Sequence, residues 1–306
     1  MSPVHRDQSA DTAIDVMRGL PRPKPLAAKG LPPGFRSERT LPVRVELARQ
    51  VRRRRTQFAL GFMMLLPIIL AVAFAFDSSA SNGGTSLVDL AQSSASNFAI
   101  VTLFFSATFL LVVVVALFFG DTIASEASWS SLRYLLAMPV PRTRLLRQKF
   151  LVAGLLSLAA VVLLPVAGWL LGSLLYGNGP LATPVGESFS GWGAISRIGL
   201  IVAYLAVNLT WVAGLAFLLS VSTDAPLGAV GGAVLLAILS QILDQIQALG
   251  AIRNWLPTHY SFAWTGAMVE PIRWDDMVRG GFSALAYAVF FTTLAFWRFS
   301  RKDINS

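Results

Sequence analysis

Six long apolar runs constrain this chain more than any other feature of its sequence. Each is about 20 residues long, which is what an α-helix needs to cross roughly 30 Å of hydrocarbon while its backbone groups bond one another. Only 13% of the residues are charged, whereas soluble domains average about 25%. The sequence therefore predicts an all-α integral membrane protein with six transmembrane helices, over residues 58–76, 98–119, 150–176, 198–221, 226–248 and 281–299.

The fourth and fifth runs are separated only by Ser222–Ala225. One long buried helix is therefore an alternative to two spans. Asp224 and Pro226 favour a tight turn at this point, because proline cannot continue a preceding helix without losing a backbone bond. We expect two separate spans.

Lysine and arginine are distributed very unevenly between the predicted connections. Of the 25 such residues, 21 share one side of the membrane if the first span enters from the cytoplasm, and 13 of these precede residue 58. Because cytoplasmic connections are enriched in lysine and arginine, we expect both termini in the cytoplasm. The expected location is the plasma (inner) membrane, crossed several times.

The segment before the first span divides into two parts. Residues 1–40 form a basic arm rich in proline and glycine, a composition typical of disorder. In residues 41–57, Val43, Leu47 and Val51 recur at four-residue spacing among arginines, which predicts an amphipathic helix on the anionic membrane surface. Arg52–Arg55 could equally be only a topology anchor. Lipid phosphates already account for this basic patch, so we expect no nucleic-acid partner.

Several kinds of catalytic site are excluded because the chain lacks the residues or motifs that they require. The chain has no cysteine, and its two histidines, His5 and His259, are far apart, so no metal site is expected. No Gly-Lys-Ser or Gly-Lys-Thr occurs, so the chain lacks the loop that cradles ATP phosphates in P-loop proteins. We expect no ATPase site and no cofactor in this chain, which is not predicted to be an enzyme.

The connection between the second and third runs carries a distinctive pattern. From Asp121, a predicted N-cap, the spacing of the apolar residues favours a helix with one apolar side, which Pro139 and Pro141 end. Residues 142–149 then begin the helix that leads into the third span. The residues that form the apolar side are Ile123, Trp129, Leu132, Leu135 and Leu136.

This connection resembles that of the ABC exporter permeases of the second type, in an acidic residue, a Ser-Leu-Arg-Tyr-Leu-Leu segment, a Pro-Val-Pro-Arg segment and a downstream lysine. These are Glu126, Ser131–Leu136, Pro139–Arg142 and Lys149. The resemblance covers the chain from Leu41 to the end. It implies six spans with both ends inside, a basic interfacial helix, a cytoplasmic coupling helix, and short outer-leaflet helices between spans five and six.

The resemblance also implies partners and a mechanism. Two permease subunits, identical or different, would pair in the lipid bilayer, each seated on a separate nucleotide-binding ATPase that holds ATP and Mg²⁺. Closure of the ATPase would be transmitted through the coupling helix to open a substrate path outward. The residues expected to couple to the ATPase are Glu126, Trp129, Leu132, Leu135, Leu136 and Arg142.

Polar residues inside the predicted spans are candidates for a substrate path, because polar groups in hydrocarbon are costly. Those singled out are Asn208, Thr210, Trp211, Gln241 and Asp244. Asp244 has an alternative role, snorkelling to the outer interface or bonding a neighbouring helix. The polar residues of the fourth span also have an alternative role, since interhelical hydrogen bonding is the commoner use of such groups.

Two other classes of function compete with the permease. An ion-gradient-driven secondary transporter predicts buried charges within spans and inverted repeats with interrupted helices. The sequence has no matching halves, and Asp244 is its only carboxylate within a predicted span. A non-transporting membrane scaffold or sensor has only the basic arm in its favour.

Overall fold

Helices form nearly all of the structure, a computed structural model that describes residues 42–76, 86–128, 142–183 and 186–301. The arm expected over residues 1–40 lies outside the described residues. The α-helices are α2 (Val43–Val51), α3 (Arg54–Ala75), α4 (Leu87–Gln92), α5 (Ala95–Ala107), α6 (Leu110–Ser128), α8 (Arg142–Leu175), α9 (Trp192–Asn208), α10 (Thr210–Ser222), α11 (Pro226–Gln245) and α12 (Asp275–Arg301). Two 3₁₀ helices, η2 (Gln247–Trp255) and η3 (Ala263–Met268), lie between α11 and α12.

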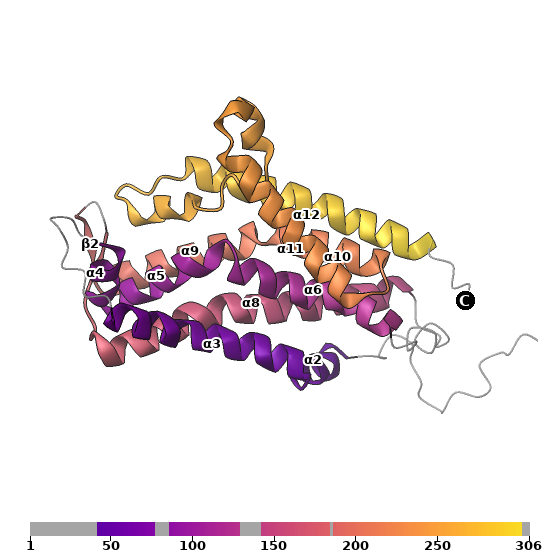
Figure 1. The fold of residues 1–306 in the computed structure, drawn as a ribbon, viewed down its shortest axis with the longest axis horizontal. Coiled ribbons are helices and arrows are strands. Elements are labelled where there is room, and N and C mark those ends of the chain that lie inside the picture. The colour runs from indigo at the N-terminus through magenta and orange to yellow at the C-terminus, as the bar shows by residue number, and fades with distance from the viewer. Residues whose placement is uncertain (1–41, 77–85, 129–141, 184–185, 302–306) are drawn as a thin grey trace, which may run out of the picture. The chain divides into compact units, whose positions relative to one another are not determined.

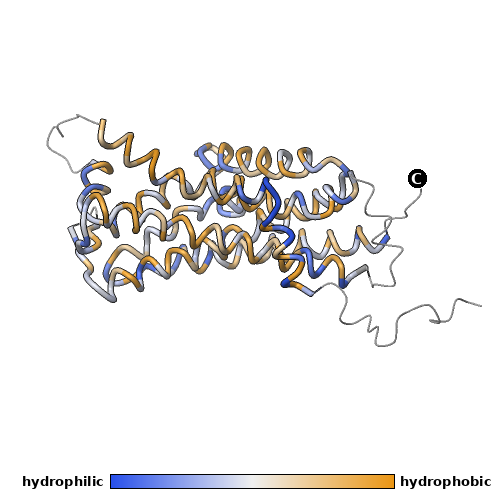
Figure 2. The backbone as a smooth tube through the Cα atoms, turned by 90° about the horizontal axis from the view of Figure 1, so that it is seen from below, coloured by the Kyte–Doolittle hydropathy of each residue, from blue (hydrophilic) through white to orange (hydrophobic). Residues whose placement is uncertain are grey.

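Among the described residues, six helical segments are long and apolar enough to cross a membrane, which is the pattern of a multi-pass membrane protein. Figure 2 shows the hydrophobic colour along most turns of these helices. They are residues 54–75, 110–128, 143–175, 192–222, 226–245 and 275–301. A small antiparallel pair, β1 (Leu181–Ala182) with β2 (Ser188–Phe189), is an addition to the expected all-α class.

The helices α6 and α10 form the centre of the described fold. Helix α10 packs against α6, α11 and α12, and α6 also packs against α8, which carries α3 and α5 on its other sides. Figure 1 shows α2 towards the end at which α12 finishes, and α4 with β2 at the opposite end. Most of α6 is buried, whereas α3, α11 and α12 leave large apolar side chains exposed, among them Phe58, Leu235 and Phe282. In a membrane such side chains contact lipid tails.

The second predicted span is divided in the structure. A single helix was expected over residues 98–119, but α5 ends at Ala107 and α6 begins at Leu110. The interruption is stabilised from another helix, because Gln241 of α11 donates a hydrogen bond from Nε2 to the Thr108 carbonyl at 2.6 Å. An unbonded carbonyl would be costly in hydrocarbon, so this side chain makes the interruption possible.

The fourth predicted span also bends, at Leu209, where α9 ends and α10 begins. The turn between the fourth and fifth spans is confirmed: α10 ends at Ser222, and α11 begins with Pro226 in its first turn. Proline suits that position, since its missing N–H would have no partner within the helix.

The basic segment before the first span is two helices with different directions. Helix α2 ends at Val51 and α3 begins at Arg54, so the run of four arginines straddles the junction. The prediction that Asp121 caps a new helix is wrong. Helix α6 runs without a break through Asp121 to Ser128, and the Asp121 carboxylate pairs with Arg55 of α3 instead of capping its own backbone.

Candidate functional site

Seven charged side chains meet where α6 ends and α8 begins. They come from four segments, α2, the α2–α3 junction with the start of α3, the end of α6, and the first turns of α8. We call this group the charged cluster: Glu46, Arg49, Arg53, Arg55, Asp121, Glu126 and Lys149. The cluster ties both sides of the connection over residues 129–141 to the helix that precedes the first span.

The centre of the charged cluster is the pair formed by Glu126 and Lys149. Lys149 Nζ lies 2.7 Å from Glu126 Oε1, and the two side chains are only 3% and 5% exposed. Lys149 also approaches Glu46 Oε1 at 3.4 Å, and Arg49 donates to both Glu46 and Glu126. One lysine and one arginine thus hold two carboxylates from α2 and α6 together, leaving no buried charge at this centre without an opposite charge.

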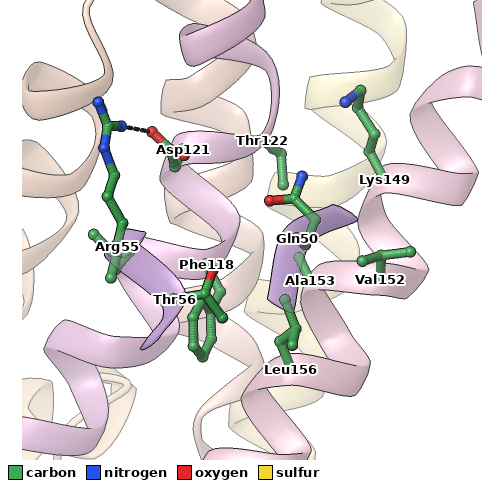
Figure 3. Close-up of a pocket in the computed structure, with 11 residues that line it drawn as sticks. Gln50, Arg55, Thr56, Phe118, Asp121, Thr122, Lys149, Val152, Ala153 and Leu156 are labelled. Atoms are coloured by element: carbon green, nitrogen blue, oxygen red, sulfur yellow. Dashed lines mark hydrogen bonds and ion pairs between the residues drawn. The ribbon is translucent and has the colours of Figure 1, made fainter. Parts of the chain in front are cut away.

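A second pairing joins α3 to α6 at the edge of the cluster. Figure 3 shows the Arg55 guanidinium reaching the Asp121 carboxylate. Arg53 lies 3.4 Å from the same carboxylate. The cavity beside these residues has a volume of about 20 Å³, enough for one water molecule. The space between these helices is therefore filled by the protein's own side chains.

The electrostatics of α2 follow from this packing. Burial by itself would raise the pKa of the Glu46 carboxyl, but the positive charges of Lys149 and Arg49 outweigh burial and lower the pKa below its usual value. Burial would likewise lower the pKa of Arg49, and its hydrogen bond to Glu46 and the charge of Glu126 raise it. Both groups are therefore charged at neutral pH, as an ion-pair network requires.

One further feature of the sequence indicates part of this arrangement. Glu46 is the only acidic residue in the basic segment over residues 41–57. Its i+3 and i+4 neighbours, Arg49 and Gln50, both donate to it. Glu126 and Lys149 were singled out by resemblance, but their pairing across 23 residues is a result of tertiary packing.

The residues predicted to couple to an ATPase fall into three groups. Glu126 is buried in the charged cluster, and its carboxylate has partners within this chain. Arg142 opens α8, and its side chain is outside the described residues. Four more lie outside the described residues altogether: Trp129, Leu132, Leu135 and Leu136.

The residues predicted to line a substrate path are not gathered around one cavity. Asn208 and Trp211 are buried at the bend between α9 and α10. Thr210 donates to the Val207 carbonyl and lines an apolar cavity of about 120 Å³ between α6, α8 and the bend. Gln241 caps the interruption between α5 and α6, as described above.

Asp244 is tied to the segment that follows α11. Its Oδ1 lies 2.6 Å from Nδ1 of His259 and 3.5 Å from Nε of Arg253. These contacts join Asp244 to Arg253 of η2 and to His259 in the turn that follows it. His259 lies between the fifth and sixth predicted spans, and its pairing with Asp244, 15 residues earlier in the chain, is a result of tertiary packing.

The part of the chain that the structure describes contains six long apolar helices with a charged cluster at one end, which defines a helical membrane protein that crosses the bilayer several times. Within that class, the chain belongs to the family described as "Protein of unknown function (DUF2705)", which it matches over residues 63–305. No curated protein matches the sequence. The matched region contains Asp121, Glu126 and Lys149 of the charged cluster, whereas α2 precedes it.

Proposed function

We propose that this chain is the membrane-spanning permease subunit of an ATP-driven exporter of the second ABC type. In this proposal it pairs with a second permease subunit and couples to a separate nucleotide-binding ATPase. The sequence supports this function through the pattern around residues 126–149 and through the absence of a phosphate-binding loop in the chain. Both termini would lie in the cytoplasm, beside the ATPase.

The observation that carries the proposal is the Glu126–Lys149 pair. These residues stand just before and just after the connection over residues 129–141, and their 2.7 Å contact holds the two sides of that connection together. A push on the connection would therefore move α6 and α8 as one unit. The role of Glu126 accordingly changes from touching the ATPase to anchoring the element that touches it.

The proposal is tested by co-purification of the chain with the ATPase encoded beside it, followed by an ATPase assay on the complex. Leu132→Asp and Trp129→Ala each remove an apolar side chain that the sequence predicts to couple to the ATPase. We expect each to weaken association by about thirty-fold, because losing one anchor at an interface costs about 2 kcal/mol. Stimulation of ATP hydrolysis by the permease should fall in parallel.

Arg147→Ala is the matched control, since Arg147 is an exposed residue near the start of α8 and an exposed charge contributes only about 0–1 kcal/mol. Association that is insensitive to Leu132→Asp but lost in Arg147→Ala would contradict coupling through the apolar side. It would indicate electrostatic anchoring to lipid instead.

An ion-gradient-driven transporter is a second candidate, and one observation favours it. Interrupted helices are typical of such carriers, and the structure has an interruption at Thr108–Phe109 and a bend at Leu209. Reconstitution of the chain alone in liposomes separates the two functions. Substrate movement driven by a proton or sodium gradient without any ATPase would support the carrier and contradict the permease.

A further inference from the structure

A large polar cavity lies where α12 begins, between the segment over residues 259–266 and the first turns of that helix. Its volume of about 540 Å³ falls in the range of about 300–1,000 Å³ that is typical of small-molecule sites. We call it the polar cavity. Its charged and aromatic lining includes His259, Tyr260, Arg273, Asp275, Asp276 and Arg279.

Two glycines hold one wall of the polar cavity in place. A Cβ atom at Gly280 would lie 2.5 Å from Cβ of Tyr260, so only glycine lets α12 approach this residue so closely. A Cβ atom at Gly266 would lie 2.6 Å from the Arg273 carbonyl oxygen, and the Arg273 N–H donates to the Gly266 carbonyl at 3.1 Å. Tyr260 and Arg273 are thereby fixed relative to α12 and η3.

The segment that begins this lining is also held by hydrogen bonds to α11 and α9. Ser240 and Thr258 share a bond of 2.7 Å between their hydroxyl oxygens. The neighbouring His259 is bonded to Asp244 at 2.6 Å, and the Tyr204 hydroxyl donates to the Tyr260 carbonyl at 2.6 Å. The polar cavity is therefore shaped before any ligand enters, which reduces the entropic cost of binding.

The charges that face the polar cavity are poorly satisfied by the protein. Among the described residues, Arg273 and Asp275 take part in no ion pair, and Arg279 approaches Asp276 only at 4.0 Å with both side chains 69% exposed. Two guanidinium groups and two carboxylates thus face one space. A ligand that carries a negative and a positive group a short distance apart complements this arrangement.

The chemistry of these groups narrows the class of ligand. Guanidinium groups bind phosphate oxygens through paired N–H donors. Carboxylates accept hydrogen bonds from a primary ammonium, whereas a quaternary ammonium has no N–H to donate. Trp255 and Trp274 are exposed beside the segments that form the cavity, and tryptophan is enriched at the level of lipid headgroups.

We propose that the polar cavity binds a phosphoethanolamine group, with Arg273 and Arg279 at the phosphate and Asp275 and Asp276 at the ammonium. The group has two sources, the headgroup of phosphatidylethanolamine and free phosphoethanolamine. The proposal does not depend on the ATPase partnership, because it rests on the cavity alone.

The full chain, purified in detergent, is titrated with phosphoethanolamine and phosphocholine by calorimetry. In parallel, native mass spectrometry measures retention of phosphatidylethanolamine, phosphatidylcholine and phosphatidylglycerol. We expect the ethanolamine compounds to bind about tenfold more tightly than the choline compounds, the effect of hydrogen bonds to charged groups. Binding of the lipid without the free compound assigns the site to the lipid headgroup, and binding of the free compound without the lipid assigns it to a soluble zwitterion.

Variants then test the assigned residues. Arg273→Gln with Arg279→Gln should weaken binding at least about tenfold, and Asp275→Asn should remove the preference for ethanolamine over choline. Arg298→Gln is the matched control, because Arg298 is an exposed arginine on the same helix, about 28 Å from Arg279 at 1.5 Å per residue. It should bind as the wild type does.

The proposal is overturned by equal binding of ethanolamine and choline compounds, or by unchanged binding in the double arginine variant. All substituted side chains in this series are exposed, and a thermal unfolding curve of each variant confirms that it is folded. Should the double variant unfold, Asp275→Asn alone decides: an unchanged preference for ethanolamine contradicts the assignment.

Discussion

The charged cluster and the polar cavity both gather opposite charges, but they use them differently. In the charged cluster, Glu126 and Lys149 are nearly inaccessible and 2.7 Å apart, beside a cavity of only about 20 Å³. Around the polar cavity, Asp276 and Arg279 are mostly exposed and 4.0 Å apart, beside about 540 Å³. Charges that pair closely with one another hold helices together. Charges without a close partner are available to bind a ligand.

The difference follows from the cost of removing charge from water. Breaking a buried ion pair leaves an uncompensated charge in a medium that cannot solvate it. An exposed pair is solvated whether or not it forms, so it contributes little. Substitution of the charged side chains should therefore affect different properties in the two regions. In the charged cluster it should lower the free energy of unfolding, and in the polar cavity it should weaken ligand binding.

The largest effect is expected in the charged cluster. Glu126→Ala removes the nearer of the two carboxylates that pair with Lys149, and we expect a loss of about 3 kcal/mol in the free energy of unfolding. This is the lower end of the range for breaking a buried pair, because Glu46, 3.4 Å from Lys149, still compensates part of the buried charge. The measurement is chemical unfolding of the detergent-solubilised protein. The double variant Glu126→Leu, Lys149→Met replaces both charges and should recover most of the loss. A double variant no more stable than Glu126→Ala would show that the pair is not the source of the stability.

A smaller effect is expected at the wall of the polar cavity. Gly280→Ala places a methyl group 2.5 Å from Cβ of Tyr260, and overpacking of this kind costs about 1–3 kcal/mol. The control is Gly231→Ala in α11, where a Cβ meets no atom within 4 Å. That variant should be neutral or stabilising, because alanine favours helix over glycine. Thermal unfolding of the two variants checks the difference, and equal curves would mean that α12 is not held against Tyr260.

The pH dependence of stability should reveal the charged cluster. The pKa of Glu46 is lowered in the folded protein, so the unfolded chain binds a proton more readily. Glu46 therefore stabilises the fold above the ordinary glutamate pKa of about 4.3, and this contribution is lost as the pH falls through the lower folded value.

Glu46→Gln should cost about 1 kcal/mol at neutral pH, within the range for a hydrogen-bonded group, and should flatten the acid side of the profile. The unfolding temperature measured from pH 7 down to pH 3 checks this. A wild type and variant with parallel profiles would contradict the ion-pair role of Glu46.

The smallest effect on stability is expected at the exposed pair of the polar cavity. Asp276→Asn and Arg279→Gln should each change the free energy of unfolding by less than about 1 kcal/mol. Chemical unfolding under the conditions used for Glu126→Ala gives the direct comparison. A loss as large as that of Glu126→Ala would mean that this pair is structural, and it would weaken the case for a ligand site.

Sequence alone determined the class of fold, because the length of an apolar run and the thickness of a bilayer are properties of the chain and the solvent. It also indicated a turn at Asp224 and Pro226 through the backbone limits of proline. It did not predict the interruption near Thr108, since residues 98–119 contain no charged residue, glycine or proline. The group that permits the interruption, Gln241, is 133 residues away.

Tertiary structure decided which polar groups meet. Glu126 finds Lys149 and Glu46 only when α2, α6 and α8 pack together, and Asp244 finds His259 only when the chain folds back after α11. The sequence does not show that Gly280 must be a glycine, because the requirement comes from Tyr260, which packs against it in the folded protein. The length of an apolar run is a local property of the sequence. Charge pairing and the close approach of two helices depend on residues that are far apart in the sequence and meet only in the folded protein.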